Sequence, residues 1–316
     1  QTYREIQENI TGEHPNTYRQ VRAGAGFAAI ALPKIIPLPV RYQKMVHEIG
    51  VIRQVLLNPP LTLNPPMNKR KGGFKRIDMN LADYISLDKD HWLCFPAKVG
   101  PLVILIYFHE IFYELGFSLV NLFEIATDED LKEQPSGIYF FGAPPAQLES
   151  LGDKEAAFYE DLDNKIFVGA VPGKLEYGYF GYLKKMVLTL HNCAMMRAGF
   201  MPYHGSLTKI VFKGHKEANI LIIGDTGAGK SETLAAFQEL GSDHISDIIP
   251  IADDMGSLAI NENGQVIGYG TEIGAFLRLD DLKPGAAFAQ LDRAIFMSVS
   301  QVNARVIIPI TQLNDV

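Results

Sequence analysis

A glycine-rich turn between an apolar run and a helical pattern dominates residues 218–240, ANILIIGDTGAGKSETLAAFQEL. Four residues, Gly224, Gly229, Lys230 and Ser231, fill the pattern G-x-x-x-x-G-K-[ST] of a phosphate-binding loop. The glycines let backbone N–H groups surround a phosphate, and the helix that follows directs its positive dipole end toward the same anion. We therefore predict a strand, a phosphate-binding loop and a helix, which together require an α/β fold.

The side chains of this loop have separate expected roles. Lys230 carries positive charge for the outer phosphates and acts in their transfer, and the Ser231 hydroxyl is a ligand for Mg²⁺. A nucleotide or pyrophosphate is expected to contact the whole loop, which consists of Gly224, Asp225, Thr226, Gly227, Ala228, Gly229, Lys230 and Ser231.

The next strand-like run, DIIPIADD, ends in two acids, Asp253 and Asp254. A strand terminus beside a phosphate-binding loop is where a metal carboxylate belongs. An ordinary acidic turn is the alternative for this dipeptide taken alone. After such a loop we favour a metal-carboxylate role for this pair of acids, and we expect Asp253 to act in catalysis.

The composition is that of a globular chain long enough for two domains: 316 residues, 47% hydrophobic and 21% charged. The net charge of −7 gives no reason to expect nucleic-acid binding. Two cysteines, Cys94 and Cys193, are too few for a disulfide framework or a thiolate metal site, which fits a reducing cytoplasm.

The longest apolar run, residues 99–108, is much shorter than the roughly 20 residues of a membrane span and predicts a buried strand. We see no signal-peptide pattern at the N-terminus and expect a cytoplasmic protein without a membrane partner. The chain begins at Gln1 rather than Met, which is compatible with a longer product.

The pattern of apolar and polar residues changes near residue 200. Alternating apolar and polar segments before it predict a mixed α/β domain, and short strand-like runs follow it. We therefore divide the chain into a substrate-side domain, residues 1–200, and a phosphate- and metal-binding domain, residues 201–316. The basic stretch NKRKGGFKR, residues 68–76, is either a solvated loop or an anion-binding loop.

Three further segments point to a family. GDTGAGKSE followed by ADD, with HGSL at residues 204–207, resembles HPr kinase/phosphorylase, whose P-loop domain is shared by phosphoenolpyruvate carboxykinase. YFGYLKKMVLTLHN, residues 179–192, looks like the carboxykinase pattern Tyr-x-Gly-x-x-Lys-Lys followed by an Asn. VNARVIIPI, residues 302–310, is similar to the Asn-x-Arg segment of that family. The resemblance to the carboxykinases covers about residues 175–310.

The resemblance implies a mixed α/β N-terminal domain and a carboxykinase-like P-loop domain that is incomplete at its C-terminal end. It also implies a role for each matched residue. Lys185, His204 and Asp254 match the catalytic Mn²⁺ ligands, with His204 following Lys185 by 19 positions (204 − 185). Arg305 matches an arginine that reaches the transferred phosphoryl group, Tyr179 matches the substrate-side tyrosine, and Lys184 is expected to contact substrate or phosphate.

The implied reaction converts oxaloacetate and a phosphoryl donor to phosphoenolpyruvate and CO₂ through a metal-stabilised enolate. Mn²⁺ or Mg²⁺ is the expected metal and ATP the expected donor, with GTP and pyrophosphate left open. The substrate arginine of the family has no evident counterpart, and Arg70 or Arg76 is its candidate replacement. An HPr-kinase-like enzyme acting on a protein or small-molecule hydroxyl and a non-catalytic nucleotide-sensing module are the alternatives. The oligomeric state stays open.

Overall fold

The computed structural model describes a mixed α/β fold with three sheets and four α-helices in the part of the chain that it covers. The helices are α2 (Val40–Val46), α3 (Tyr113–Phe117), α4 (Pro145–Leu148) and α5 (Phe180–Arg197). The described residues are 26–154, 156–214, 216–224, 233, 241, 243–252, 254–282 and 288–309.

The largest sheet has nine strands in the order β1-β2-β5-β6-β8-β10-β9-β4, with β7 paired to β5. Its central pairs β6–β8 and β8–β10 are parallel, while β1–β2, β5–β6 and β9–β10 are antiparallel. The strands are β1 (Phe27–Pro33), β2 (Gly50–Leu57), β4 (Lys75–Arg76), β5 (Trp92–Val99), β6 (Leu102–His109), β7 (Glu124–Ile125), β8 (Gly137–Ala143), β9 (Ala157–Asp161) and β10 (Ile166–Pro172).

Both faces of this sheet are covered, which explains its continuous apolar strands. Along β8 the residues alternate between two cores: Tyr139 and Phe141 belong to one cluster, and Ile138 and Phe140 belong to the other. Successive strand residues face opposite sides, so a strand buried on both faces needs apolar residues throughout. The apolar run 99–108 forms the end of β5, a turn and most of β6, and the prediction of a buried strand is confirmed.

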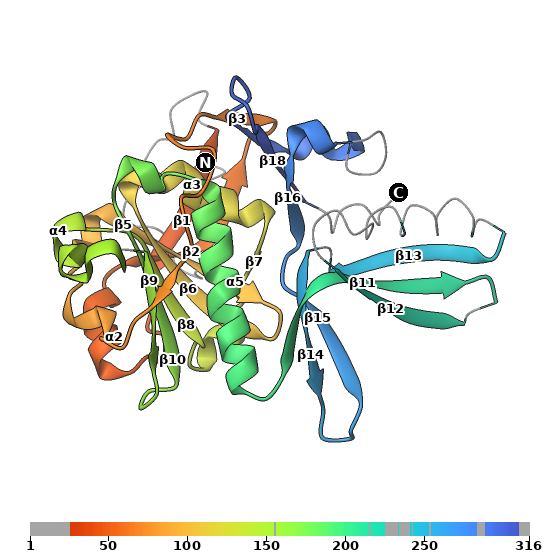
Figure 1. The fold of residues 1–316 in the computed structure, drawn as a ribbon, viewed down its shortest axis with the longest axis horizontal. Coiled ribbons are helices and arrows are strands. Elements are labelled where there is room, and N and C mark those ends of the chain that lie inside the picture. The colour runs from red at the N-terminus through yellow and green to blue at the C-terminus, as the bar shows by residue number, and fades with distance from the viewer. Residues whose placement is uncertain are drawn as a thin grey trace, which may run out of the picture.

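The longest helix, α5, packs on one face of the large sheet against β6, β8 and β10 (Figure 1). Its first turns are buried nearly all round, as expected of a helix enclosed by other elements. Phe180 contacts Phe276 of the third sheet, with ring centroids 5.0 Å apart. Among the described residues, no helix is both long and apolar enough for a membrane span.

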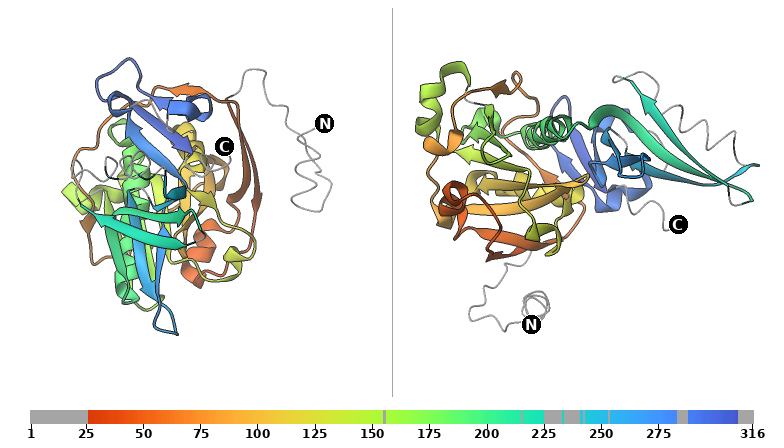
Figure 2. Two further views of the ribbon diagram at one scale, coloured as in Figure 1. Left: turned by 90° about the vertical axis from the view of Figure 1, so that its right-hand side faces the viewer. Right: turned by 90° about the horizontal axis from the view of Figure 1, so that it is seen from below.

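The second sheet extends away from α5 (Figures 1 and 2). Its strands are β11 (Met201–Phe212), β12 (Glu217–Ile223), β13 (Ile245–Ala252), β14 (Met255–Ile260) and β15 (Val266–Gly270). The long strand β11 pairs with β12 and β13 along one part and with β14 at its start, all antiparallel. The predicted strand before the phosphate-binding loop is confirmed as β12, whereas the loop itself after Gly224 lies outside the described residues.

A third sheet joins segments that are far apart in the chain. It has the order β16-β18-β17-β3, and its strands are β16 (Gly274–Arg278), β18 (Arg305–Pro309), β17 (Ile295–Met297) and β3 (Leu61–Leu63). The parallel pairing of β17 with β3 brings residues 61–63 into a sheet otherwise built after residue 273. The two predicted domains thus share this sheet, and the boundary near residue 200 stays a prediction.

Candidate functional site

Two adjacent lysines of α5 point to different surroundings. The Lys184 side chain is 5% exposed, whereas that of Lys185 is 44% exposed. Consecutive residues of a helix project about 100° apart, so one lysine can be buried against the second sheet while the next faces the open side. Both amines approach Asp254, which separates β13 from β14.

The Asp254 carboxylate is the centre of a cluster of charged side chains that also contains Lys184, Lys185 and His204. Its Oδ2 lies 2.9 Å from Lys184 Nζ and 3.6 Å from Lys185 Nζ, and its Oδ1 lies 3.0 Å from His204 Nε2. The backbone N–H of Gly205 donates to the Asp254 carbonyl at 3.0 Å, and His204 pairs with Met255 in the β11–β14 ladder. The structure therefore brings together Lys185 from helix α5, His204 from within strand β11 and Asp254 from the connection between β13 and β14.

The separations of Lys185 and His204 from Asp254 are compatible with ligands of one divalent metal. Ligands about 2.1 Å from an octahedral ion lie roughly 3 Å apart, close to the 3.0 and 3.6 Å separations observed here. The set combines a carboxylate oxygen, an imidazole nitrogen and an amine, which donates its lone pair only when neutral. Among the described residues no group of three His, Cys, Asp or Glu side chains forms a metal cluster, so this site depends on the lysine.

The opposite charges of neighbouring side chains set the protonation states of Lys184 and Asp254. Burial alone would lower the pKa of Lys184, but the carboxylates of Glu272 and Asp254 raise it above the usual value. Burial alone would raise the pKa of Asp254, but Lys184 and Lys185 hold it below its ordinary 3.8. Asp254 is therefore an anion, and Lys184 a cation, throughout the neutral pH range.

Glu272, between β15 and β16, is a site neighbour that sequence reasoning missed. Its Oε1 lies 2.9 Å from Lys184 Nζ, and its side chain is 6% exposed. Burial raises the pKa of Glu272, while the charge of Lys184 opposes that rise. The sequence carried no signal for this contact, because a single Glu in the linker GTEIG matches no metal or catalytic pattern.

Arg305 and Tyr179 lie together on the other flank of α5. Arg305 begins β18, and its guanidinium lies 5.5 Å from the centre of the Phe276 ring. Its buried Nε has no hydrogen-bond partner among the described residues. Burial raises the pKa of Tyr179, and the charges of Arg305, Lys184 and Arg70 oppose that rise. The predicted phosphoryl-contacting arginine and substrate-side tyrosine are thus neighbours.

The basic stretch, residues 68–76, is tied to this flank by hydrogen bonds. Asn68 Nδ2 donates to the Val302 carbonyl at 2.6 Å, and Asn303 Nδ2 donates to the Asn68 carbonyl at 2.6 Å. The N–H of Lys71 donates to the Tyr182 hydroxyl at 3.0 Å. These contacts tether the stretch beside the start of α5, while most of its side chains stay exposed to solvent, so both alternatives for it stay open.

The structure separates the two candidate substrate arginines. Arg70 lies 5.1 Å from the Phe74 ring centre, and its charge acts on Tyr179. Arg76 instead pairs with Glu160 at 3.0 Å, and Glu160 also pairs with Arg197 at the end of α5. Arg70 is therefore the arginine beside the candidate site.

Some predicted residues are not placed. Asp253 lies outside the described residues, as do Asp225, Thr226, Gly227, Ala228, Gly229, Lys230 and Ser231 of the loop. The N–H of Gly224, where the loop begins, donates to the His204 carbonyl at 3.2 Å. The chain thus enters the loop next to a member of the cluster.

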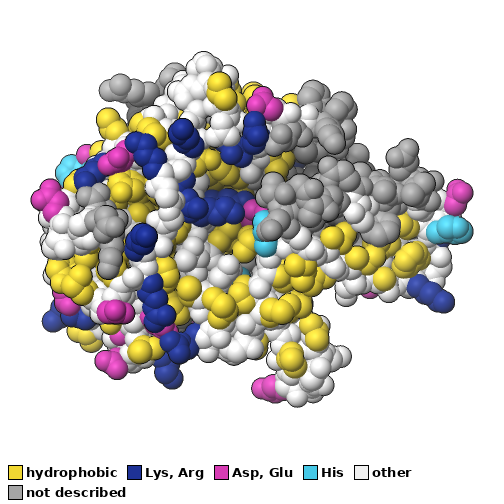
Figure 3. Space-filling model, in the orientation of Figure 1, with side chains coloured by type: hydrophobic (Ala, Val, Ile, Leu, Met, Phe, Trp, Pro, Cys, Tyr) yellow, Lys and Arg dark blue, Asp and Glu magenta, His cyan; other side chains and the backbone are white. Residues whose placement is uncertain are grey.

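In the space-filling view, Lys and Arg side chains gather beside α5, at a hollow with a histidine and an acidic side chain at its edge (Figure 3). Neither a comparison with protein-family models nor one with curated proteins finds a match for this chain. The resemblance to the carboxykinases therefore depends on the sequence motifs.

Proposed function

We propose that this chain is a phosphoenolpyruvate-carboxykinase-like enzyme whose second sheet and phosphate-binding loop form a carboxykinase-like P-loop domain. It converts oxaloacetate and a phosphoryl donor to phosphoenolpyruvate and CO₂. The observation that carries the proposal is the simultaneous approach of Lys185 and His204 to Asp254. A kinase that acts on a hydroxyl has no enolate to stabilise and no need of this lysine–histidine pair.

The metal site is proposed for Mn²⁺ or Mg²⁺ held by Lys185, His204 and Asp254. When bound, such an ion would supply positive charge to the substrate oxygen that becomes negative during decarboxylation. Ser231 is the proposed ligand of a second ion on the donor phosphates. Asp254 contributes the one anionic ligand among the three residues, and its backbone carbonyl accepts a hydrogen bond from the Gly205 N–H.

The chain's other residues bind and orient the reactants. Arg70 and Tyr179 bind a carboxylate group of oxaloacetate, because both lie beside the start of α5. Arg305 neutralises charge on the phosphoryl group in transfer, since its Nε is buried without a partner among the described residues. Lys230 and the loop backbone bind ATP, GTP or pyrophosphate, and Asp253 assists catalysis beside Asp254.

Parallel assays on two variants test the proposal. With oxaloacetate, Mn²⁺ and each donor, the wild type is expected to form phosphoenolpyruvate. Lys230→Ala is expected to lose phosphoenolpyruvate formation yet retain slow pyruvate formation, because an enolate that receives no phosphate is protonated. His204→Ala is expected to lose both products. A wild type that consumes no oxaloacetate with any donor but phosphorylates a serine-containing protein would establish the HPr-kinase-like function instead.

A further inference from the structure

The linker that carries Glu272 is fixed from both sides. The Thr271 hydroxyl donates to the Met255 carbonyl at 2.9 Å, which ties the linker to the second sheet. The N–H of Ile273 donates to the Leu122 carbonyl at 2.9 Å, which ties it to the large-sheet region. At Gly274 a Cβ would collide with the carbonyl oxygen of Asn121, so the backbone passes too closely for any other residue. The position of Glu272 is therefore set by contacts on each flank.

Lys184 forms a bridge between two carboxylates. Its Nζ lies 2.9 Å from Glu272 Oε1 and 2.9 Å from Asp254 Oδ2, and the lysine side chain is 5% exposed. A buried ammonium beside a metal-binding carboxylate competes with a divalent cation for that carboxylate and repels the cation. Glu272 supplies the negative charge that offsets this repulsion.

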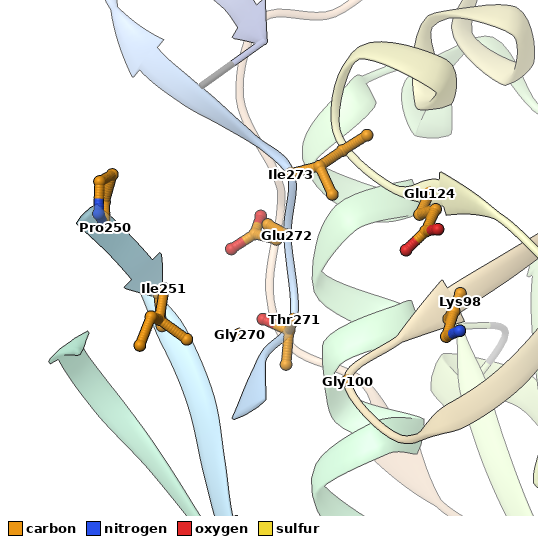
Figure 4. A pocket seen from close by; sticks show the side chains of 10 residues that line it. Lys98, Gly100, Glu124, Pro250, Ile251, Gly270, Thr271, Glu272 and Ile273 are labelled. Carbon is orange, nitrogen blue, oxygen red and sulfur yellow. The ribbon is translucent and has the colours of Figure 1, made fainter. Parts of the chain in front are cut away.

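Glu272 also belongs to the wall of a cavity of about 150 Å³ between the large sheet and the second sheet (Figure 4). Glu124 and Lys98 line the opposite wall, and Lys98 is paired with Asp130 at 3.0 Å. Glu124 is exposed, in contrast to Glu272. Glu124 thus offers a matched carboxylate on the same cavity that does not bridge to the cluster.

We propose that Glu272 is a positioning residue, which neutralises Lys184 and orients it so that Asp254 can bind a divalent cation together with Lys185 and His204. This inference rests on the proposed function, because it takes these three residues as the metal ligands. It adds a residue outside the matched motifs to the machinery of the site. It also explains why a lysine is buried next to the proposed ligand carboxylate.

Titration of the purified full chain with Mn²⁺ alone, followed by electron paramagnetic resonance, tests the inference without substrate. Loss of a partner behind a metal ligand weakens metal binding by about 10–100-fold, and we expect Glu272→Gln to fall in this range. Glu272→Asp keeps the charge and is expected to retain most of the affinity. Glu124→Gln, the control, is expected to bind Mn²⁺ like the wild type.

A double variant separates charge balance from folding. Lys184→Met combined with Glu272→Gln removes both charges, and the inference expects it to recover affinity close to that of the wild type. If Glu272→Gln does not fold, this double variant still decides: near wild-type binding supports the inference, and a loss of 10-fold or more overturns it. Equal Mn²⁺ affinity of the wild type and a folded Glu272→Gln also overturns it, while leaving the proposed function intact. A wild type that binds no Mn²⁺ overturns both.

Discussion

The large sheet buries apolar side chains on both of its faces, whereas the described residues of the second sheet form only a small core. That small core centres on Tyr203, Leu207 and Ala252. The lysines of the candidate site are carried by α5, which is embedded in the larger core. His204 lies within strand β11 of the second sheet, and Asp254 lies in the connection between its strands β13 and β14. Their geometry consequently depends on contacts made across to α5, among them the ion pairs of Asp254 with Lys184 and Lys185.

The largest effect is expected from a matched pair of core substitutions. Leu105 is fully buried in the large sheet, and Leu207 is 6% exposed in the second. Leu→Ala substitutions cost about 2–5 kcal/mol, depending on how far the surroundings can relax. We expect Leu105→Ala to lose about 4–5 kcal/mol of unfolding free energy and Leu207→Ala about 2–3 kcal/mol. Urea unfolding followed by circular dichroism measures both, and equal losses would contradict the contrast between the two cores.

How far the sequence predicts this structure also differs between regions. Local patterns indicated the strands: the apolar run 99–108 became the end of β5, a turn and most of β6, and ANILIIG contributed most of β12. Two acids after a strand indicated Asp253 and Asp254 together, and only the resemblance to the carboxykinases selected Asp254. These features depend on neighbours in the chain, which a periodic pattern can reveal.

Contacts between distant segments could not be predicted. Residues 61–63 pair with β17, more than 200 positions later, and nothing in LTL indicates such a partner. Glu272 reaches Lys184 only because the linker is fixed between two sheets. Arg70 and Arg76 belong to one basic stretch and look equivalent until their partners are known. Tertiary packing, rather than local pattern, selects these residues.

An intermediate effect is expected from substituting Arg70 and Arg76. Arg70 lies near Tyr179 at the start of α5, whereas Arg76 pairs with Glu160 near the end of α5. Arg70→Gln is expected to raise the KM for oxaloacetate by about 10–100-fold, because a hydrogen bond to a charged group contributes about 1.5–3 kcal/mol. Arg76→Gln should leave KM unchanged, since its partner is Glu160. Steady-state kinetics on both variants provides the measurement. A larger KM change for Arg76→Gln would move the substrate to the other end of α5.

The smallest effect concerns His191, which joins α5 to the second sheet. The buried ring contacts the Asn192 side chain at 3.0 Å and the Ser257 hydroxyl of β14 at 3.4 Å. Burial lowers the pKa of His191 below its ordinary 6.5. The unfolded chain, in which this pKa is the ordinary one, therefore binds the proton more readily than the folded chain. The contribution of neutral His191 to stability is complete above pH 6.5. Its contribution is lost as the pH falls below that value, by at most about 1.4 kcal/mol per pH unit.

Unfolding free energies at pH 7.5 and 5.5 should therefore differ less in His191→Gln than in the wild type. If the two proteins show the same difference, protonation of His191 does not loosen the contact between α5 and the second sheet.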